Sequence, residues 1–310
     1  MSSPQAHVND SIQAVDENTW LLGERLLLSR QPKAPQSPHH ASWSDGSGGF
    51  FVLSDAPSPL PSHHHPHPAQ SAILPRVYAA GDQSAVWAAG SGAFIKARDR
   101  RHPRVTPEHA TLEFLHSQSE PLDCRIPDVL YHGEWDGRYY LVVSRVPGVT
   151  LTEAWPAMGD ELRQYYVERV AGLCEKMVEW TGEGGVCGVD GGQVMELYLA
   201  NDDQCLEPEV LRRNCVGMGM DVADLVFYHC DLGPGNILVE PDTRGIGVID
   251  WEIAGYVPRE WVRTKFHLSS GMDFPNDDNE ETKSDWRRSV ARKLAAKGFA
   301  EVIDGWLAFQ

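Results

Sequence analysis

Positive charge is scarce in this chain. Its 310 residues include 27 Lys and Arg against 44 Asp and Glu, which gives a formal net charge of −17 with His neutral. A protein that binds nucleic acid needs Lys and Arg clustered against the phosphate backbone, so this composition predicts no nucleic-acid partner. The excess of carboxylates favours a cationic ligand over an anionic one, because a cleft lined by acids concentrates cations.

Long apolar runs and paired cysteines are also absent. A membrane-spanning helix needs about 20 apolar residues, and the run 139–143 is typical of the short ones found here. Residues 1–10 lack the basic and apolar regions of a signal peptide. The six cysteines are Cys124, Cys174, Cys187, Cys205, Cys215 and Cys230. They form no C-x-x-C pair and indicate thiols of a reducing compartment, so we expect a cytoplasmic protein with no membrane segment.

The first part of the chain, residues 1–75, does not resemble a folded core. Apolar residues between 16 and 29 predict one amphipathic helix, with Asn18 or Thr19 as its N-cap. From 31 to 71 the chain is rich in Pro, Ser, His and Gly. Such a segment buries too little apolar surface to offset its loss of chain entropy, so we expect it to be disordered.

Two short stretches of this segment differ from the rest. Phe50-Phe51-Val52-Leu53 is apolar and predicts a short strand. The histidines at 63, 64, 65 and 67 could hold a metal. We favour a solvated low-complexity loop, because a metal site also needs fixed geometry and supporting contacts around its ligands.

From residue 74 onward the pattern becomes that of a small antiparallel sheet. Three strand-like runs cover 76–80, 84–89 and 93–98, with glycine-containing turns between them. A helix then opens with Thr106 as N-cap, Pro107 at its first position and Glu108 in its first turn. Two more strands follow, around 128–132 and 138–144.

Beyond Pro147 the pattern is mainly helical. Helices are expected over 160–181, 208–215, 261–268 and 286–306. Two apolar strands, 225–228 and 247–249, bracket the most informative segment of the chain. The fold class predicted from these elements is α+β.

The segment between those strands carries the residue types of phosphoryl transfer. His229, Asp231 and Asn236 form the pattern H-x-D-x-x-x-x-N, and Asp250 closes the second strand. The Asp231 carboxylate suits a base that accepts the proton of an attacking hydroxyl. Asn236 and Asp250 offer the hard oxygen ligands that Mg²⁺ prefers. The alternative is that the two aspartates only cap turns.

The N-terminal half supplies a second pair of charged residues. Lys96 lies in the strand AFIKAR, and a Lys directed inward from a strand needs a charged partner. Glu108, in the first turn of the following helix, could pair with it and hold it toward nucleotide phosphates. Alternatively, Lys96 is a solubilising residue of an edge strand and Glu108 complements the helix dipole.

These motifs resemble those of the aminoglycoside phosphotransferase family of kinase-like enzymes, in the form common in fungal genomes. HCDLGPGNILV matches the family's catalytic loop and VIDWEIAGYVP its metal-binding segment. FIKA and PEHATLEFL match its nucleotide-anchoring strand and helix. The resemblance implies a two-lobed, protein-kinase-like fold. Its N-lobe would span 76–146 and its helical C-lobe 147–310, with residues 1–75 as an extension.

The resemblance also implies roles for individual residues. Asp231 would be the catalytic base, Asn236 and Asp250 would bind Mg²⁺, and Lys96 and Glu108 would anchor the phosphates of ATP. The hinge, Ser144-Arg145-Val146, would contact adenine through its backbone.

One part of the chain departs from the pattern of kinases. The phosphate-covering loop, residues 80–84, lacks G-x-G-x-x-G, so the Ser84 hydroxyl and backbone amides would have to serve. Asp82 in the same loop is an unusual neighbour for a phosphate, because both groups are negative.

The function predicted is transfer of the γ-phosphoryl group of ATP to a hydroxyl of a small molecule. A protein kinase is the first alternative, although no long activation segment and no A-P-E motif follow Asp250. A non-catalytic nucleotide-binding protein is the second. The acceptor is expected to be hydroxylated and cationic, and the acids near its site would include Asp202, Asp203 and Glu252. The acidic run 277–281 is better explained as a solvated loop.

Overall fold

The chain folds into two compact units. The computed structural model describes residues 7–36, 39–61, 73–100, 104–200, 204–269, 271–275 and 280–310, with side chains from residue 282 in the last range. The first unit contains residues 1–103 and 127–145, and the second contains 104–126 and 146–310. None of the helices in the described ranges is long and apolar enough to span a membrane. All six cysteines are free thiols.

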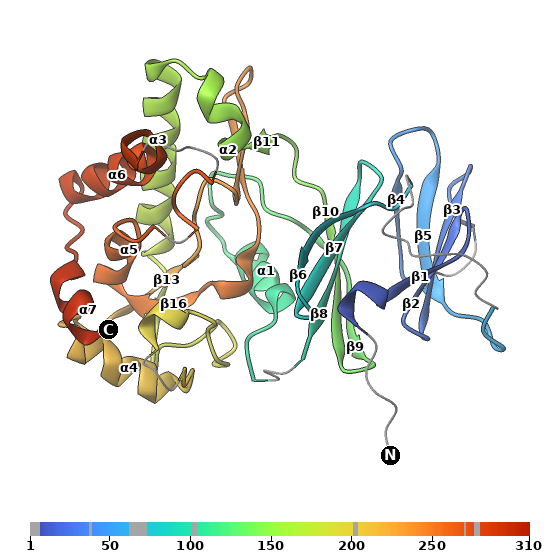
Figure 1. Ribbon diagram of the computed structural model, residues 1–310, viewed down its shortest axis with the longest axis horizontal. Coiled ribbons are helices and arrows are strands. Elements are labelled where there is room, and N and C mark those ends of the chain that lie inside the picture. The colour runs from blue at the N-terminus through green and yellow to red at the C-terminus, as the bar shows by residue number, and fades with distance from the viewer. Residues whose placement is uncertain are drawn as a thin grey trace. The chain divides into compact units, whose positions relative to one another are not determined.

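The first unit is built from two five-stranded antiparallel sheets (Figure 1). One sheet has the order β1-β2-β3-β5-β4, with β1 Ile12–Asp16, β2 Thr19–Leu22, β3 Leu26–Gln31, β4 Ala41–Ser44 and β5 Phe50–Asp55. The other has the order β6-β7-β8-β10-β9, with β6 Arg76–Ala80, β7 Ser84–Ala89, β8 Ala93–Asp99, β9 Val129–Trp135 and β10 Arg138–Ser144. The second sheet confirms the predicted N-lobe strands.

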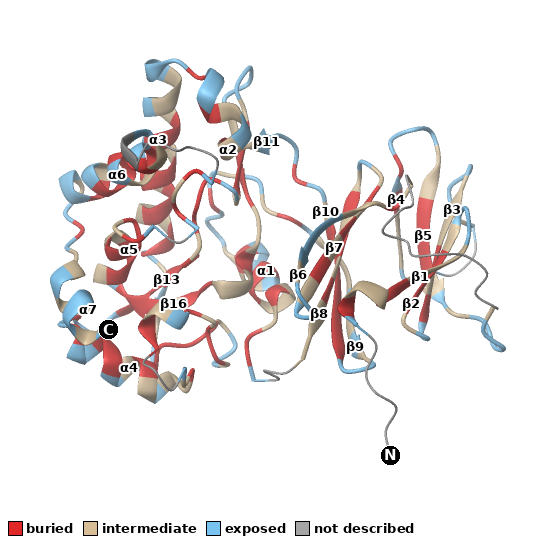
Figure 2. Ribbon diagram, viewed as in Figure 1, coloured by how far each residue is buried: buried red, intermediate tan, exposed pale blue. Residues whose placement is uncertain are grey.

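The two sheets share one hydrophobic core. Trp20 and Phe51 contribute to it from the first sheet, and Trp87, Ile95 and Tyr140 contribute from the second. Side chains alternate between the faces of a strand, and β7 accordingly alternates between buried and half-buried positions, whereas three successive residues of β5 are buried (Figure 2). One face of the second sheet is therefore covered by the strands of the chain's first 55 residues.

Two predictions for residues 1–75 are wrong. The predicted helix over 16–29 is instead the strand pair β2 and β3, and the turn between them contains Gly23 at φ +54°. Clustered leucines fit the periodicity of a helix or of a strand. Here they are strands, because their side chains pack against the face of the second sheet. The predicted disorder of 31–71 does not hold for β4 and β5, whereas the predicted strand at 50–53 is confirmed within β5. The histidines at 63, 64, 65 and 67 lie outside the described residues.

The turn between β4 and β5 explains why polar composition was misleading there. Asp45 accepts hydrogen bonds from the backbone amides of Ser47 and Gly49, at 2.7 and 2.8 Å. The Arg30 guanidinium lies 2.7 Å from the same carboxylate. The Ser47 amide and this guanidinium hold the pKa of Asp45 well below its usual range. The polar residues of the segment therefore bond to one another instead of to water.

The second unit is mainly helical. Its helices are α1 Glu108–Ser117, α2 Leu151–Ala154, α3 Asp160–Met177, α4 Pro208–Gly217, α5 Arg259–Lys265, α6 Glu280–Ala296 and α7 Ile303–Phe309. Two small sheets have the orders β11-β14-β15 and β12-β13-β16. Their strands are β11 Val149–Thr150, β12 Thr181–Gly182, β13 Leu225–Tyr228, β14 Ile237–Glu240, β15 Gly245–Val248 and β16 Gly255–Pro258. The short 3₁₀ helix η5, Trp251–Ile253, follows β15.

Two helix predictions in this unit need correction. Pro107, not Thr106, is the N-cap residue of α1, and the Thr106 hydroxyl donates to Asp190. The helix predicted over 286–306 is two helices, α6 and α7, which are separated around Gly298 at φ +83°. A left-handed glycine commonly ends a helix.

Truncating a core residue of the first sheet tests whether β5 is part of the folded structure. Phe51 is 1% exposed, so Phe51→Ala should lower the free energy of unfolding by about 3–5 kcal/mol. Chemical denaturation of the whole chain measures this loss. Val77→Ala, at an exposed apolar position, is the control and should have little effect. Equal stability of the two variants would contradict the structure.

Candidate active site

The predicted catalytic loop joins β13 to β14, and His229 holds its backbone in place. The ring of His229 is fully buried. Its Nδ1 accepts the Asp231 amide at 3.2 Å, and its Nε2 donates to the Ile249 carbonyl at 3.0 Å. These two bonds require the neutral ring with its proton on Nε2. The His229 side chain therefore connects the loop to the end of β15.

Asp231 and Asn236 lie together, as predicted. The Nδ2 group of Asn236 donates to Oδ2 of Asp231 and to the Asp231 carbonyl, each at 2.9 Å. The Gly233 amide donates to the same carbonyl at 2.9 Å, which closes the tight turn between them. Because the amide nitrogen of Asn236 is used in this way, Oδ1 is the atom of this side chain that can bind a metal.

Asp231, and not its neighbour Cys230, is the residue that can take part in a reaction here. Its neighbour Cys230 is fully buried, and burial raises the pKa of the Cys230 thiol well above its usual range. A protonated thiol is a poor nucleophile. Cys230 also has φ +65°, a conformation that costs a non-glycine residue of the order of 1–3 kcal/mol.

Asp250 lies at the end of the neighbouring strand in a left-handed conformation, with φ +64° and ψ +57°. The preceding amide, of Ile249, donates to the Asn236 carbonyl at 3.0 Å. The following residue, Trp251, is fully buried and packs against the His229 ring with centroids 4.6 Å apart. These contacts fix Asp250 beside the catalytic loop.

Two glutamates complete an acidic cluster with Asp250. Carboxylate oxygens of Glu108, Asp250 and Glu252 all lie within 4.8 Å of one another. Glu108 comes from the first turn of α1, is 4% exposed, and accepts the Trp251 amide at 3.3 Å. Three carboxylates at this spacing repel one another unless a cation or a proton lies among them. Hard oxygen donors of this kind fit Mg²⁺.

This cluster was only partly predicted. Asp250 was expected to bind metal, Glu108 was expected to pair with Lys96, and Glu252 was considered only as an acid near the acceptor. The cluster joins residues more than 140 positions apart, so sequence spacing carries no signal for it. The two acids of VIDWE are the only local hint.

Lys96 and Ser84 lie in the first unit, on β8 and β7. Lys96 is paired with Val86 on one side and with Leu141 on the other. Ala97 and Ile95, its neighbours along the strand, point into the shared core, so Lys96 lies on the opposite face of the sheet. The same alternation places Ser84 on the Lys96 face. The pairing of Lys96 with Glu108 concerns residues of different units and stays a prediction.

The hinge residues have contacts of their own. The Ser144 amide donates to the Asp128 carbonyl at 2.9 Å, and the Ser144 hydroxyl accepts the Asp128 amide at 2.8 Å. The predicted adenine contact through the backbone of 144–146 stays a prediction, in which the Ser144 amide is already bonded to Asp128. Val146 is buried.

The carboxylate of Asp82 is bonded within the protein. Its carboxylate accepts the Val8 amide at 2.6 Å and lies 3.5 Å from the buried guanidinium of Arg138. The acid that was unexpected in the loop 80–84 thus holds the short segment Val8–Asp10 that precedes β1.

A buried ion pair near the catalytic loop had no signal in the sequence. Lys265 Nζ lies 2.7 Å from Glu196 Oε2, and both side chains are at most 4% exposed. Burial lowers the pKa of Lys265, but the charge and hydrogen bond of Glu196 outweigh it, so the net direction is upward. Removing either partner would leave an uncompensated charge in the core.

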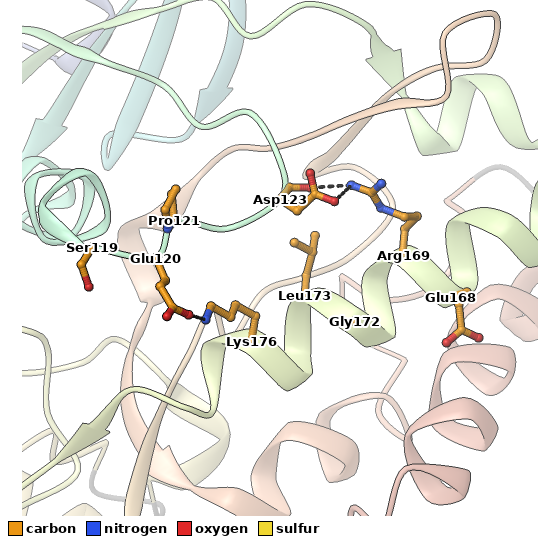
Figure 3. Close-up of a pocket in the computed structure, with 9 residues that line it drawn as sticks. All are labelled: Ser119, Glu120, Pro121, Asp123, Glu168, Arg169, Gly172, Leu173 and Lys176. Carbon is orange, nitrogen blue, oxygen red and sulfur yellow. Dashed lines mark hydrogen bonds and ion pairs between the residues drawn. The ribbon is translucent and has the colours of Figure 1, made fainter.

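A separate cavity of about 690 Å³ opens between the segment 119–123 and α3 (Figure 3). Two ion pairs join its lining residues, while Glu168 pairs with Lys293 and Lys297 instead. Lys176 lies 2.6 Å from Glu120, and Arg169 lies 3.0 Å from Asp123. None of the predicted site residues lines this cavity. We assign it no part in the reaction.

Comparison with known sequences identifies relatives. The family described as "Phosphotransferase enzyme family" matches residues 192–261, which contain the catalytic loop and the acidic strand end. The aminoglycoside 3'-phosphotransferase of Streptomyces fradiae is 30% identical over 234 residues, which cover 69% of this chain and 74% of that protein. The enzyme of the same name from Streptomyces ribosidificus is 27% identical over 186 residues, covering 52% and 69%.

Solved structures show the same fold. An aminoglycoside phosphotransferase from Streptomyces rimosus superposes with a TM-score of 0.51 at 20% identity, over 78% of this chain and 93% of that one. The aminoglycoside phosphotransferase APH(4)-Ia superposes with a TM-score of 0.51 at 15% identity, over 77% and 83%. The predicted kinase-like α+β fold and the predicted class of enzyme, a small-molecule kinase, are confirmed. The chain belongs to the aminoglycoside phosphotransferase family.

Proposed function

We propose that this protein transfers the γ-phosphoryl group of ATP, with Mg²⁺ as cofactor, to a hydroxyl of a small cationic molecule. The observation that carries the proposal is the Asp231 carboxylate, oriented by Asn236 and tied through His229 to the strand that ends at Asp250. A base and a set of oxygen donors thereby lie on neighbouring loops of one unit. Phosphoryl transfer depends on such positioning.

In the proposed reaction Asp231 acts as the base. Its carboxylate accepts the proton of the acceptor hydroxyl while that oxygen forms a bond to the γ-phosphorus of ATP. The bond from this phosphorus to the bridging oxygen breaks, and ADP leaves with the bonding electrons. The hydrogen bond from Asn236 to Oδ2 holds the carboxylate in one rotamer, which leaves Oδ1 to receive the proton.

Asn236 Oδ1 and Asp250 would hold Mg²⁺, and the carboxylates of Glu108 and Glu252 lie close enough to Asp250 to support that site. When bound, the ion neutralises charge on the phosphate oxygens. Lys96 would bind the α- and β-phosphates as a point charge, with the predicted help of Glu108.

Two other nucleotide contacts are proposed, one from the Ser84 side chain and one from the hinge backbone. Ser84 lies on the Lys96 face of its sheet, where its hydroxyl would reach a phosphate. The adenine contact is proposed for backbone groups of Ser144 and Val146, other than the Ser144 amide that Asp128 accepts. Free thiols and the need for ATP support a cytoplasmic location.

The acceptor class is proposed from charge and from the relatives. The relatives are named for aminoglycosides, molecules that carry both hydroxyl and amino groups. A net charge of −17 favours such cations over anionic sugars. We propose a hydroxylated amine as acceptor, with no nucleic acid or membrane as partner.

Replacing the base tests the central assignment. Asp231→Asn should lower kcat by about 10²-fold or more while the Kd for Mg²⁺·ATP changes little, because a base acts on the transition state. ATP turnover and calorimetry measure the two quantities. Asp224→Asn, an exposed acid ahead of β13, is the matched control and should turn over like the unchanged protein. Full turnover by the Asp231 variant would refute the mechanism.

Replacing Asp250 tests the metal assignment. Asp250→Asn should weaken binding of Mn²⁺, used as a paramagnetic probe, by at least tenfold, because one carboxylate ligand loses its charge. Electron paramagnetic resonance measures free Mn²⁺ directly, without turnover. Glu113→Gln removes an exposed acid from α1 and should leave the affinity unchanged. Equal affinity in both variants would exclude Asp250 as a ligand.

Salt dependence tests the proposed acceptor class. In a screen of aminoglycosides, other hydroxylated amines and neutral sugars, the best acceptor should be a cation. Its kcat/KM should fall as ionic strength rises, because salt screens charges beyond about 10 Å at 0.1 M. A neutral hydroxylated analogue provides the comparison and should respond less. A sugar acid as best substrate would contradict the charge argument and leave the kinase assignment intact.

A further inference from the structure

Gly271 lies against the proposed catalytic carboxylate. It follows α5 in the chain and has φ +69°, a left-handed conformation that favours glycine. A β-carbon built on Gly271 would lie 2.8 Å from Oδ1 of Asp231. This is the carboxylate oxygen opposite Oδ2, which Asn236 engages. Asp231 is therefore held between a hydrogen bond on one side and the backbone of Gly271 on the other.

A second glycine on the catalytic loop meets the same backbone. A β-carbon built on Gly233 would lie 1.9 Å from the carbonyl oxygen of Gly271. A β-carbon does not fit at that distance. The backbone at Gly233 is therefore in close contact with the backbone at Gly271. The contact explains the glycine at 233 independently of the turn itself.

The residues after Gly271 are anchored. Met272 is fully buried, and Phe274 is 7% exposed and packs on Trp155 with centroids 5.5 Å apart. The carboxylate of Asp273 pairs with Arg287 of α6, and the same guanidinium donates to the His267 carbonyl at 3.1 Å. The backbone at 271 is thus fixed from one side and cannot retreat freely from Asp231.

We propose that Gly271 is a positioning residue for the reaction, because its missing side chain leaves Oδ1 of Asp231 where the acceptor hydroxyl must meet it. The inference rests on the proposed role of Asp231 as base. A methyl group added at Gly271 would contact the carboxylate end of the Asp231 side chain, which can move aside. The fold would therefore tolerate the change, but the carboxylate would leave its orientation against Asn236. Errors of a few tenths of an ångström in such a group lower the rate.

Gly271→Ala tests the proposal against a matched control. Gly298 also has positive φ, at +83°, and a β-carbon there meets open space, so Gly298→Ala carries the same backbone cost without the contact. Relative to that control, Gly271→Ala should lower kcat at least tenfold for ATP hydrolysis, in which water is the acceptor. The Kd for Mg²⁺·ATP should stay within twofold, and the melting temperatures of the two variants should agree.

A second variant covers the case in which Gly271→Ala folds poorly. Asp273→Asn weakens the anchor without adding an atom near Asp231, and it should lower kcat with unchanged Kd for Mg²⁺·ATP. A kcat for Gly271→Ala within twofold of the Gly298→Ala value, or an equal loss in Kd and kcat, would overturn the proposal. Asp231→Asn, measured alongside, separates the two hypotheses. If it retains full turnover, the proposed function fails; if it is inactive while Gly271→Ala is not, only the role of Gly271 fails.

Discussion

The active site depends on the two hydrogen bonds of the His229 ring. The ring lies between the catalytic loop and the strand end that carries Asp250, and it bonds to the backbone of both. A buried imidazole with both nitrogens bonded cannot rotate without leaving a polar group unpaired, which costs about 1–3 kcal/mol. The packing of Trp251 on its face adds a second restraint. The relative positions of Asp231 and Asp250 follow from this one side chain.

The acids around Asp250 are held by strain and burial as much as by hydrogen bonds. Asp250 has a left-handed backbone, which turns its side chain out of the strand direction. Glu108 is buried and anchored to the Trp251 amide, so the carboxylates cannot separate by simple rotation. A preformed cluster of this kind is suited to a divalent ion that a nucleotide brings with it.

The first unit contains a sheet that kinase-like motifs do not require. Its strands β1 to β5 cover one face of the sheet that carries Lys96, and its Trp20 and Phe51 complete that core. The Lys96 strand is therefore backed by a packed layer, which restricts its movement. The ion pair of Asp82 with Arg138 joins the loop 80–84 to β10 of its own sheet, and its bond to the Val8 amide joins the loop to the segment that precedes β1.

The segment 229–236 was predictable because its functional residues lie close together in the sequence. Asp231 and Asn236 are five residues apart on one turn, and the apolar strands on either side are visible as runs of Val, Ile and Leu. The N-lobe strands and the helix predicted over 160–181, observed as α3 over 160–177, followed from periodicity in the same way. For these elements each residue's preference agrees with the final fold, so the sequence alone is enough.

The remaining features arise from contacts between distant segments. The leucines around Trp20 suit a helix or a strand, and only the sheet they cover decides between them. The cluster of Glu108 with Asp250 and the approach of Gly271 to Asp231 join parts of the chain that no spacing rule connects. The amino-acid sequence by itself indicated the family and the segments that carry Asp231, Asn236 and Asp250. Tertiary structure decided which acids gather and what orients the base, because those depend on side chains brought together by packing.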